Sequence, residues 1–134
     1  MLAARAVYIG TPAFTETFPR KRDAVCRARR LTRLALKDWN LTDLSDSAVL
    51  ICSELVTNSV EHARGNSLRL TVTRRFRYVR ISVVDLSRTL PSTQRAGASS
   101  EHGRGLIIVG ALASEWDTDP LPWGKRVWAH LDVP

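Results

Sequence analysis

Cross-linking residues are scarce in this chain. Its 134 residues include two cysteines, Cys26 and Cys52. Two thiolates cannot complete a four-ligand zinc site by themselves, and both cysteines fall in helix-like sequence. We therefore expect two reduced, buried thiols, as in cytoplasmic proteins, and a fold that depends on its apolar core.

Long hydrophobic runs are also missing. The longest has eight residues, Leu106–Ala113, whereas a helix that crosses a bilayer needs about 20. The first residues, Met1–Ala6, carry no long apolar stretch behind their charge. We therefore expect no membrane partner and no secretory signal, and a cytoplasmic location.

Two common catalytic signatures are absent as well, and acidic residues are in the minority. The chain has no Gly-Lys-Ser/Thr phosphate loop and no Gly-x-Ser-x-Gly nucleophile turn. Twenty basic and 13 acidic side chains give a net charge of +7, with basic clusters at 20–37 and 69–80. Such clusters favour a polyanion or an acidic protein surface. Nucleic acid is not the expected partner, because no helix-turn-helix, zinc or aromatic RNA-binding signature accompanies them.

The composition is that of one globular domain. Hydrophobic residues make up 44% of the chain and charged residues 25%. We expect a loose N-terminal segment over residues 1–13 and a single domain over residues 14–134.

Alternating apolar residues predict the strands, and helical spacing predicts the helices. The expected strands are 14–18, 68–73, 79–83, 116–119 and 126–132. The expected helices are 22–39, 47–63 and 106–114. Residues 86–102 lack periodicity, and loops of that length are usually lids or binding loops. This order predicts an α/β (α+β) sandwich, with a mixed, mostly antiparallel sheet and the helices packed on one face.

The second expected helix has three N-cap candidates and one apolar stripe. The N-cap candidates are Asp43, Ser45 and Asp46. The stripe consists of Val49, Cys52, Val56, Val60 and Ala63. We expect this stripe to face the core.

Glu54 and Asn58 lie one turn apart on one face of this helix. The face points away from the expected stripe, so a solvated surface is one interpretation. Leu50, Ile51 and Leu55 flank it, however, so the helix should be largely covered, and buried polar groups need partners. A carboxylate beside an amide oxygen can hold Mg²⁺ or activate a hydroxyl group.

Asp85 shares strand parity with Val79, Ile81 and Val83, so its carboxylate should face the core at the end of its strand. A backbone cap and an acceptor for an exocyclic amine, such as that of adenine, both suit this position.

Further along, Gly103–Gly105 precedes the third expected helix. Glycines allow a close backbone approach and a helix start attracts phosphate, although the same pattern is an ordinary helix entry.

Together these segments resemble the motifs of the Bergerat ATP-binding fold, which gyrase-type ATPases, histidine kinases and anti-sigma factors share. Glu54–Ala63 resembles the N box, Val83–Asp85 the first glycine box and Gly103–Ala113 the second. Gly124–Trp128 resembles the final strand motif. The resemblance is greatest to the stand-alone anti-sigma regulatory factor type and covers residues 14–132.

The resemblance implies a role for each matching residue. Asn58 would bind Mg²⁺, Asp85 would accept from the adenine amino group, and Glu54 would be the catalytic general base. Residues 86–102 would be the ATP lid. Four residues of the second glycine box would contact the nucleotide, namely Gly103, Arg104, Gly105 and Leu106.

Three features depart from the family pattern: Trp116–Asp117 replaces an expected Trp-Gly pair, which bears on structure, and two single positions bear on nucleotide contacts. Ser87 replaces a glycine that many members have, and Lys125 stands where gyrase-like members have a small hydroxyl residue. The change at Ser87 bears on the turn at the adenine side, and the change at Lys125 on contacts at the final strand motif.

The function implied by the resemblance is that of a serine/threonine protein kinase that uses ATP and Mg²⁺. Its partners would be a sigma factor, an anti-anti-sigma (STAS-type) protein whose serine it phosphorylates, and a second copy in a homodimer. An ATP-gated module that sequesters a partner without phosphorylating it is the main alternative. Nucleic-acid binding through the arginine clusters is a third. A histidine kinase is less expected, because no dimerisation and phosphoacceptor helices precede the domain.

Overall fold

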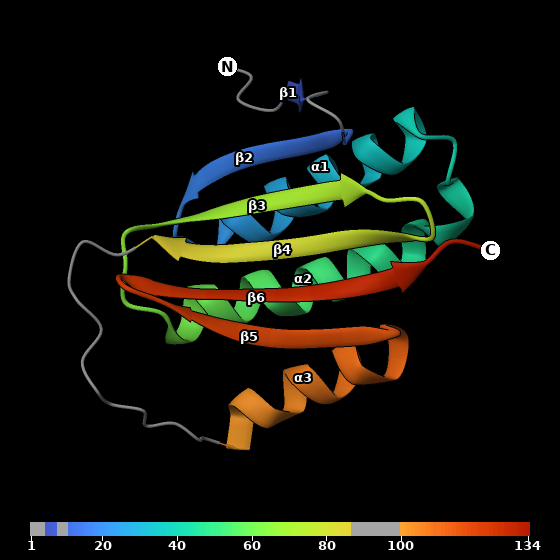
Figure 1. The fold of residues 1–134 in the computed structure, drawn as a ribbon. Helices are drawn as coiled ribbons and strands as arrows, with labels where there is room; N and C mark the ends of the chain where they lie inside the picture. The colour runs from blue at the N-terminus through green and yellow to red at the C-terminus, as the bar shows by residue number, and fades with distance from the viewer. Residues whose placement is uncertain (1–4, 8–10, 87–99) are drawn as a thin grey trace.

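The computed structural model describes residues 5–7, 11–86 and 100–134 (Figure 1). Most of the expected lid, at 87–99, lies outside the described residues. Among the described residues, no helix combines the length and the apolar composition that a membrane span requires.

The described strands form one sheet in the order β1-β2-β3-β4-β6-β5, and every pairing is antiparallel. The strands are β1 (Arg5–Val7), β2 (Ala13–Pro19), β3 (Ser67–Arg74), β4 (Tyr78–Leu86), β5 (Glu115–Leu121) and β6 (Gly124–Asp132). The expected strands are therefore confirmed, and the sheet contains no parallel pair among these strands. The segment expected to be loose contributes β1, which pairs with β2 at the edge of the sheet.

The helices lie on one side of the sheet (Figure 1). They are α1 (Asp23–Asp38), the short 3₁₀ helix η1 (Thr42–Leu44), α2 (Ser45–His62) and α3 (Ser100–Leu112). Helix α1 packs on β2 and β3, α2 packs on β4 and β6, and α3 lies beside α2 and contacts β5. The fold is thus the expected α+β sandwich with its helices on one face, but the described strands form an antiparallel sheet and not the mixed sheet that was predicted.

Helix α3 begins earlier than the glycine pattern predicts. Gly103 and Gly105 lie inside the helix, which starts at Ser100. A helical glycine costs only about 1 kcal/mol relative to alanine, so two glycines need not delay a helix start when neighbouring contacts favour the helix.

The start of α2 also differs from expectation. The N-cap residue is Leu44, with no side-chain cap, so none of the three polar candidates has that role. The reason is that η1 runs directly into α2: the backbone N–H of Ser45 donates to the carbonyl of Thr42. Backbone groups of η1 replace the side-chain cap here.

The core forms between the inner face of the sheet and α1 and α2. Leu68, Leu70 and Val72 of β3 are fully buried, which confirms the predicted alternation. The buried residues of α2 are Ala48, Ile51, Cys52, Ser53, Leu55, Val56 and Ser59. The predicted buried stripe of α2 is therefore wrong in part, because the buried face is rotated about the helix axis. Val49 and Val60, which were expected to face the core, are only half-buried. The small side chains of Ala48 and Ser59 let α2 approach the layer below it.

The two cysteines differ in their environments. Cys52 is fully buried, and burial raises its pKa to about 11. Cys26 is exposed on α1, contrary to the expected burial of both thiols. Its position in the helix places it among exposed arginines rather than on the apolar face.

Candidate functional site

The C-terminal half of α2 encloses a small cavity against the sheet. Its lining comes from α2 (Leu55, Asn58, Ser59), β4 (Val83, Asp85) and β6 (Lys125, Val127). The cavity volume is about 10 Å³, which is the space of about one water molecule. The structure thus places Asn58 and Asp85 beside one cavity, although they lie on different elements.

Asp85 is the acidic residue of this cavity and is 5% exposed. Its Oδ1 atom is buried without a hydrogen-bond partner among the described residues. Burial raises the pKa of the Asp85 carboxyl above its usual value. The Gly65 amide opposes this rise most strongly, followed by the charges of Arg20 and Lys125. The predicted core-facing orientation is confirmed.

Ser59 is a cavity residue that sequence reasoning missed. Its hydroxyl Oγ is buried and has no hydrogen-bond partner among the described residues, like Asp85 Oδ1. Two unpartnered polar atoms beside one cavity are uncommon, because most buried polar atoms find a partner. Ser59 follows Asn58 directly, but a serine within an apolar helix gives no signal of its own in the sequence.

Gly124 allows β6 to approach Asp85. A Cβ atom at this position would lie 2.2 Å from the backbone carbonyl oxygen of Asp85, a distance that atoms do not adopt. Only glycine fits here without a shift of the backbone. The glycine of the final strand motif therefore has a steric role at this site.

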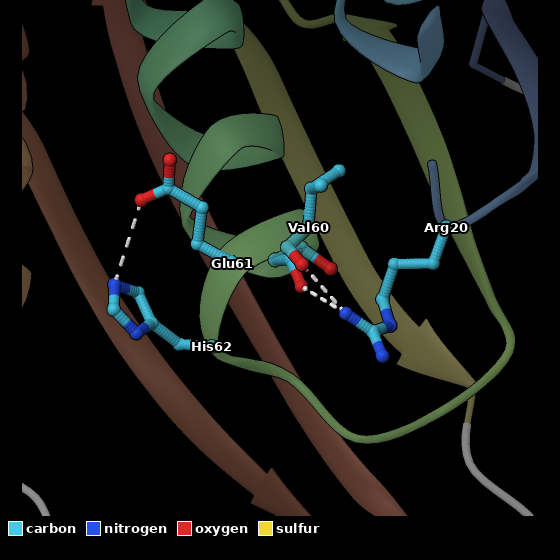
Figure 2. A network of polar contacts seen from close by, with 5 residues as sticks. Arg20, Val60, Glu61 and His62 are labelled. Atoms are coloured by element: carbon cyan, nitrogen blue, oxygen red, sulfur yellow. Dashed lines mark hydrogen bonds and ion pairs between the residues drawn. The ribbon is translucent and has the colours of Figure 1, made fainter. Parts of the chain in front are cut away.

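Arg20 links β2 to the end of α2 (Figure 2). Its Nη1 donates to the carbonyl oxygens of Val60 at 2.6 Å and Ser59 at 3.3 Å, and its Nε donates to that of Gly65. Its backbone N–H donates to the carbonyl of Asn66 at 2.9 Å. The guanidinium thereby binds the turn whose amides reach Asp85.

Glu54 lies apart from these contacts. It is half-buried one turn before Asn58, and it is not among the residues that line the cavity. At the end of the helix, His62 Nε2 lies 3.8 Å from Glu61 Oε1, an exposed pair on the surface (Figure 2). Neither residue of this pair lines the cavity.

The second glycine box is placed on α3, beside α2. Gly103, Arg104, Gly105 and Leu106 all lie in the helix, and Leu106 packs against the core. Val109, one turn further on, is fully buried and anchors α3. Helix α3 starts toward the end of the sheet where β4 ends and β6 begins, which is the end that holds the cavity (Figure 1).

The oxygen donors near the cavity suit a hard cation. The Asn58 amide oxygen and the Glu54 carboxylate are one turn apart on α2. Mg²⁺ commonly takes only one or two protein ligands and completes its shell with water and substrate phosphates, so these residues fit it. Among the described residues there is no cluster of three or more His, Cys, Asp or Glu side chains that could hold a metal.

The family of the chain follows from a comparison with family models. The model of the histidine kinase-like ATPase domain matches residues 18–130, so the protein belongs to this family. The match implies ATP binding and supports an ATP-dependent regulatory protein. A comparison with curated proteins gave no match.

Proposed function

We propose that the protein is an ATP-binding regulator that recognises adenine through Asp85. The observation that carries this proposal is the pair of unpartnered polar atoms, Asp85 Oδ1 and Ser59 Oγ, beside one cavity. An adenine amino group is a donor, and a buried carboxylate oxygen without a partner is a complementary acceptor. The described cavity has room for an amino group or a water molecule rather than for a whole base.

The phosphate end of the nucleotide would lie toward Asn58 and the first turns of α3. Asn58 has the amide oxygen that Mg²⁺ accepts as a ligand, and Gly103 and Gly105 allow close backbone approach. Bound Mg²⁺ would neutralise charge on the phosphates. Gly103, Arg104, Gly105 and Leu106 remain our proposed contacts at this end of the nucleotide.

We further propose that the protein is a serine/threonine kinase of the anti-sigma regulatory type, acting on an anti-anti-sigma partner. The partner's serine hydroxyl would give its proton to the Glu54 carboxylate, and the serine oxygen would bond to the γ-phosphorus. The bond from that phosphorus to the bridging oxygen of ADP would break, which leaves phosphoserine and ADP. The half-buried position of Glu54, one turn from Asn58, supports this role.

A second function competes, because Glu54 does not line the cavity that holds Asp85. In that case the protein would be an ATP-gated module that sequesters a sigma factor or another regulator without transferring phosphate. The two functions share the nucleotide site and differ only in the need for a base.

ATP binding is tested first, by calorimetric titration of the protein with ATP in the presence and absence of Mg²⁺. We expect saturable binding that Mg²⁺ strengthens. Replacement of Asn58 by alanine should remove the Mg²⁺ effect, because alanine has no oxygen ligand. Failure of the wild-type protein to bind ATP would refute the proposed function.

Phosphate transfer is tested by mass analysis of a candidate anti-anti-sigma protein after incubation with ATP. Glu54→Ala should lower transfer about 10²–10⁴-fold, the usual contribution of a general base, with ATP affinity nearly unchanged. Glu61→Ala, at an exposed carboxylate of the same helix, is the matched control. Absence of transfer by a wild-type protein that binds ATP and a sigma factor would establish the passive module. Loss of ATP binding in Glu54→Ala would make Glu54 a binding or structural residue.

A further inference from the structure

We propose that Arg20 is a positioning residue for adenine selectivity, acting through the turn at 63–66 that it binds. This inference rests on the proposed recognition of adenine by Asp85. Arg20 lies just after β2 and is distant in sequence from both α2 and β4. It belongs to none of the motifs that suggest nucleotide binding, and it does not line the cavity.

The first step of the argument is that Arg20 binds the end of α2. The last carbonyl groups of a helix have no partner within the helix, and an arginine near them is favourable both as a donor and as a charge at the negative end of the helix dipole. Arg20 Nη1 reaches the carbonyl oxygens of Val60 and Ser59, at 2.6 and 3.3 Å (Figure 2). Arg20 therefore fixes the last turn of α2, which holds the cavity residue Ser59.

The second step is that the same guanidinium fixes the turn after the helix. Its Nε donates to the carbonyl of Gly65, while the backbone N–H of Arg20 donates to the carbonyl of Asn66. That backbone bond continues the β2–β3 pairing beyond Pro19 and Ser67. Gly65 is buried, whereas its neighbours Arg64 and Asn66 are exposed, so the bonds from Arg20 reach the buried part of the turn and its edge.

The third step connects this turn to Asp85. The backbone amides of Gly65 and Arg64 favour the charged form of the Asp85 carboxylate, so the environment of the carboxylate depends on where the turn lies. The Oδ1 atom of Asp85 is buried without a hydrogen-bond partner among the described residues, and Asp85 lines the cavity. Loss of Arg20 would free the turn, and the carboxylate could then rotate away from the orientation that an adenine amino group needs.

Lysine could not replace this arginine. Arg20 makes side-chain bonds to three carbonyl groups that converge from a helix and a turn. A guanidinium has donors in a fixed planar fork, whereas an ammonium group is a point charge on a flexible stem. We therefore expect Arg20→Lys to retain only part of the effect.

The test compares the affinities of ATP and inosine triphosphate, which carries a carbonyl oxygen in place of the amino group. Wild type should prefer ATP by about 10- to 150-fold, the factor that one charge-assisted hydrogen bond gives. Arg20→Ala should reduce this preference to within about threefold of unity, mainly by weakening ATP binding. Arg22→Ala, at an exposed arginine two residues later, is the matched control and should leave the preference unchanged.

A merely structural arginine would change the two affinities by the same factor, because its loss would not discriminate between the bases. An unchanged preference in a folded Arg20→Ala would therefore overturn the role of Arg20 and leave adenine recognition by Asp85 intact. No preference in the wild-type protein would overturn adenine recognition itself, and the role of Arg20 with it.

Two further measurements cover a variant that does not fold. Arg20→Lys should give a preference between those of wild type and Arg20→Ala, and a wild-type preference would refute the need for the guanidinium. Without nucleotide, hydrogen exchange of the Arg64 and Gly65 amides should be at least about tenfold faster in Arg20→Lys than in wild type, while the amides of β3 stay protected. Unchanged exchange of these two amides would show that Arg20 does not hold the turn.

Discussion

Replacement of Gly124 by alanine tests how closely β6 must approach the backbone of Asp85. The added Cβ would lie 2.2 Å from the Asp85 carbonyl oxygen and 3.3 Å from its carbonyl carbon. Ordinary contact begins at 3.4 Å, and both opposing atoms belong to the backbone. The start of β6 and the end of β4 must therefore separate by about 1 Å, since no side-chain rotation can relieve the contact.

The expected magnitude follows from this displacement. Overpacking of this kind typically costs about 1–3 kcal/mol, compared with a total stability of about 5–15 kcal/mol for a domain, so the variant should fold but unfold more easily. The same separation moves Lys125 relative to Asp85 at the cavity. We therefore expect ATP affinity to fall as well, up to the factor of about 10 to 150 that one charge-assisted hydrogen bond gives.

Urea unfolding followed by circular dichroism and calorimetric ATP titration would measure both effects. Gly110→Ala is the matched control, because its Cβ would meet only the Nε1 atom of the Trp116 side chain, at 3.3 Å. Alanine is also favoured over glycine within a helix by about 1 kcal/mol, so this variant should be neutral or slightly more stable. Wild-type stability and ATP affinity in Gly124→Ala would refute the close approach of β6 to Asp85.

Three other predictions concern single side chains. Asp85→Asn keeps the shape of the side chain but loses the charged acceptor, so calorimetry should show ATP affinity lower by about 10- to 150-fold; unchanged affinity in the folded variant would remove Asp85 from the site. Burial, assisted by the charge of Arg80, lowers the pKa of His130 below the ordinary value for a histidine side chain. The unfolded chain therefore binds this proton more readily, so the stability contributed by neutral His130 is complete above the unfolded pKa and is lost as the pH falls through the folded pKa. His130→Gln should reduce the stability difference between about pH 7.5 and about pH 5.5 in urea unfolding, and an undiminished difference would contradict this. Finally, a thiol reagent at neutral pH should label exposed Cys26 and spare Cys52, whose pKa is raised to about 11, until the protein unfolds; equal labelling by mass spectrometry would contradict the burial of Cys52.

Local periodicity was sufficient to predict the strands from β2 onward and the burial of one candidate site residue. In a strand, alternate residues face opposite sides, so the apolar residues of β4 also determine the side on which Asp85 lies. Val79, Ile81 and Val83 are buried, and Asp85 follows them into the same layer. The motif spacing likewise predicted the family, which the match over residues 18–130 confirms.

Periodicity predicted α2 less well, because a helix that is apolar around most of its circumference does not specify its inner face. The choice between Val49 and Ala48 depended on which surface could approach the sheet and α1 most closely. Sequence pattern also failed to predict the N-cap of α2. Because η1 continues directly into α2, none of the polar residues expected at that position caps the helix. Neighbouring elements decided both outcomes.

The amino-acid sequence by itself determined the order of the strands from β2 onward and of the three α-helices, the burial of Asp85 and the family. Only the tertiary structure decided that Ser59 lines the same cavity as Asp85, that Gly124 must be a glycine, and that Arg20 binds the turn beside Asp85. Arg20 and Val60 are 40 positions apart in the chain, and their hydrogen bond exists because β2 pairs with β3 while α2 packs across the sheet. Periodicity reports which side of its own element a residue faces, but which distant residue it meets depends on how the elements pack.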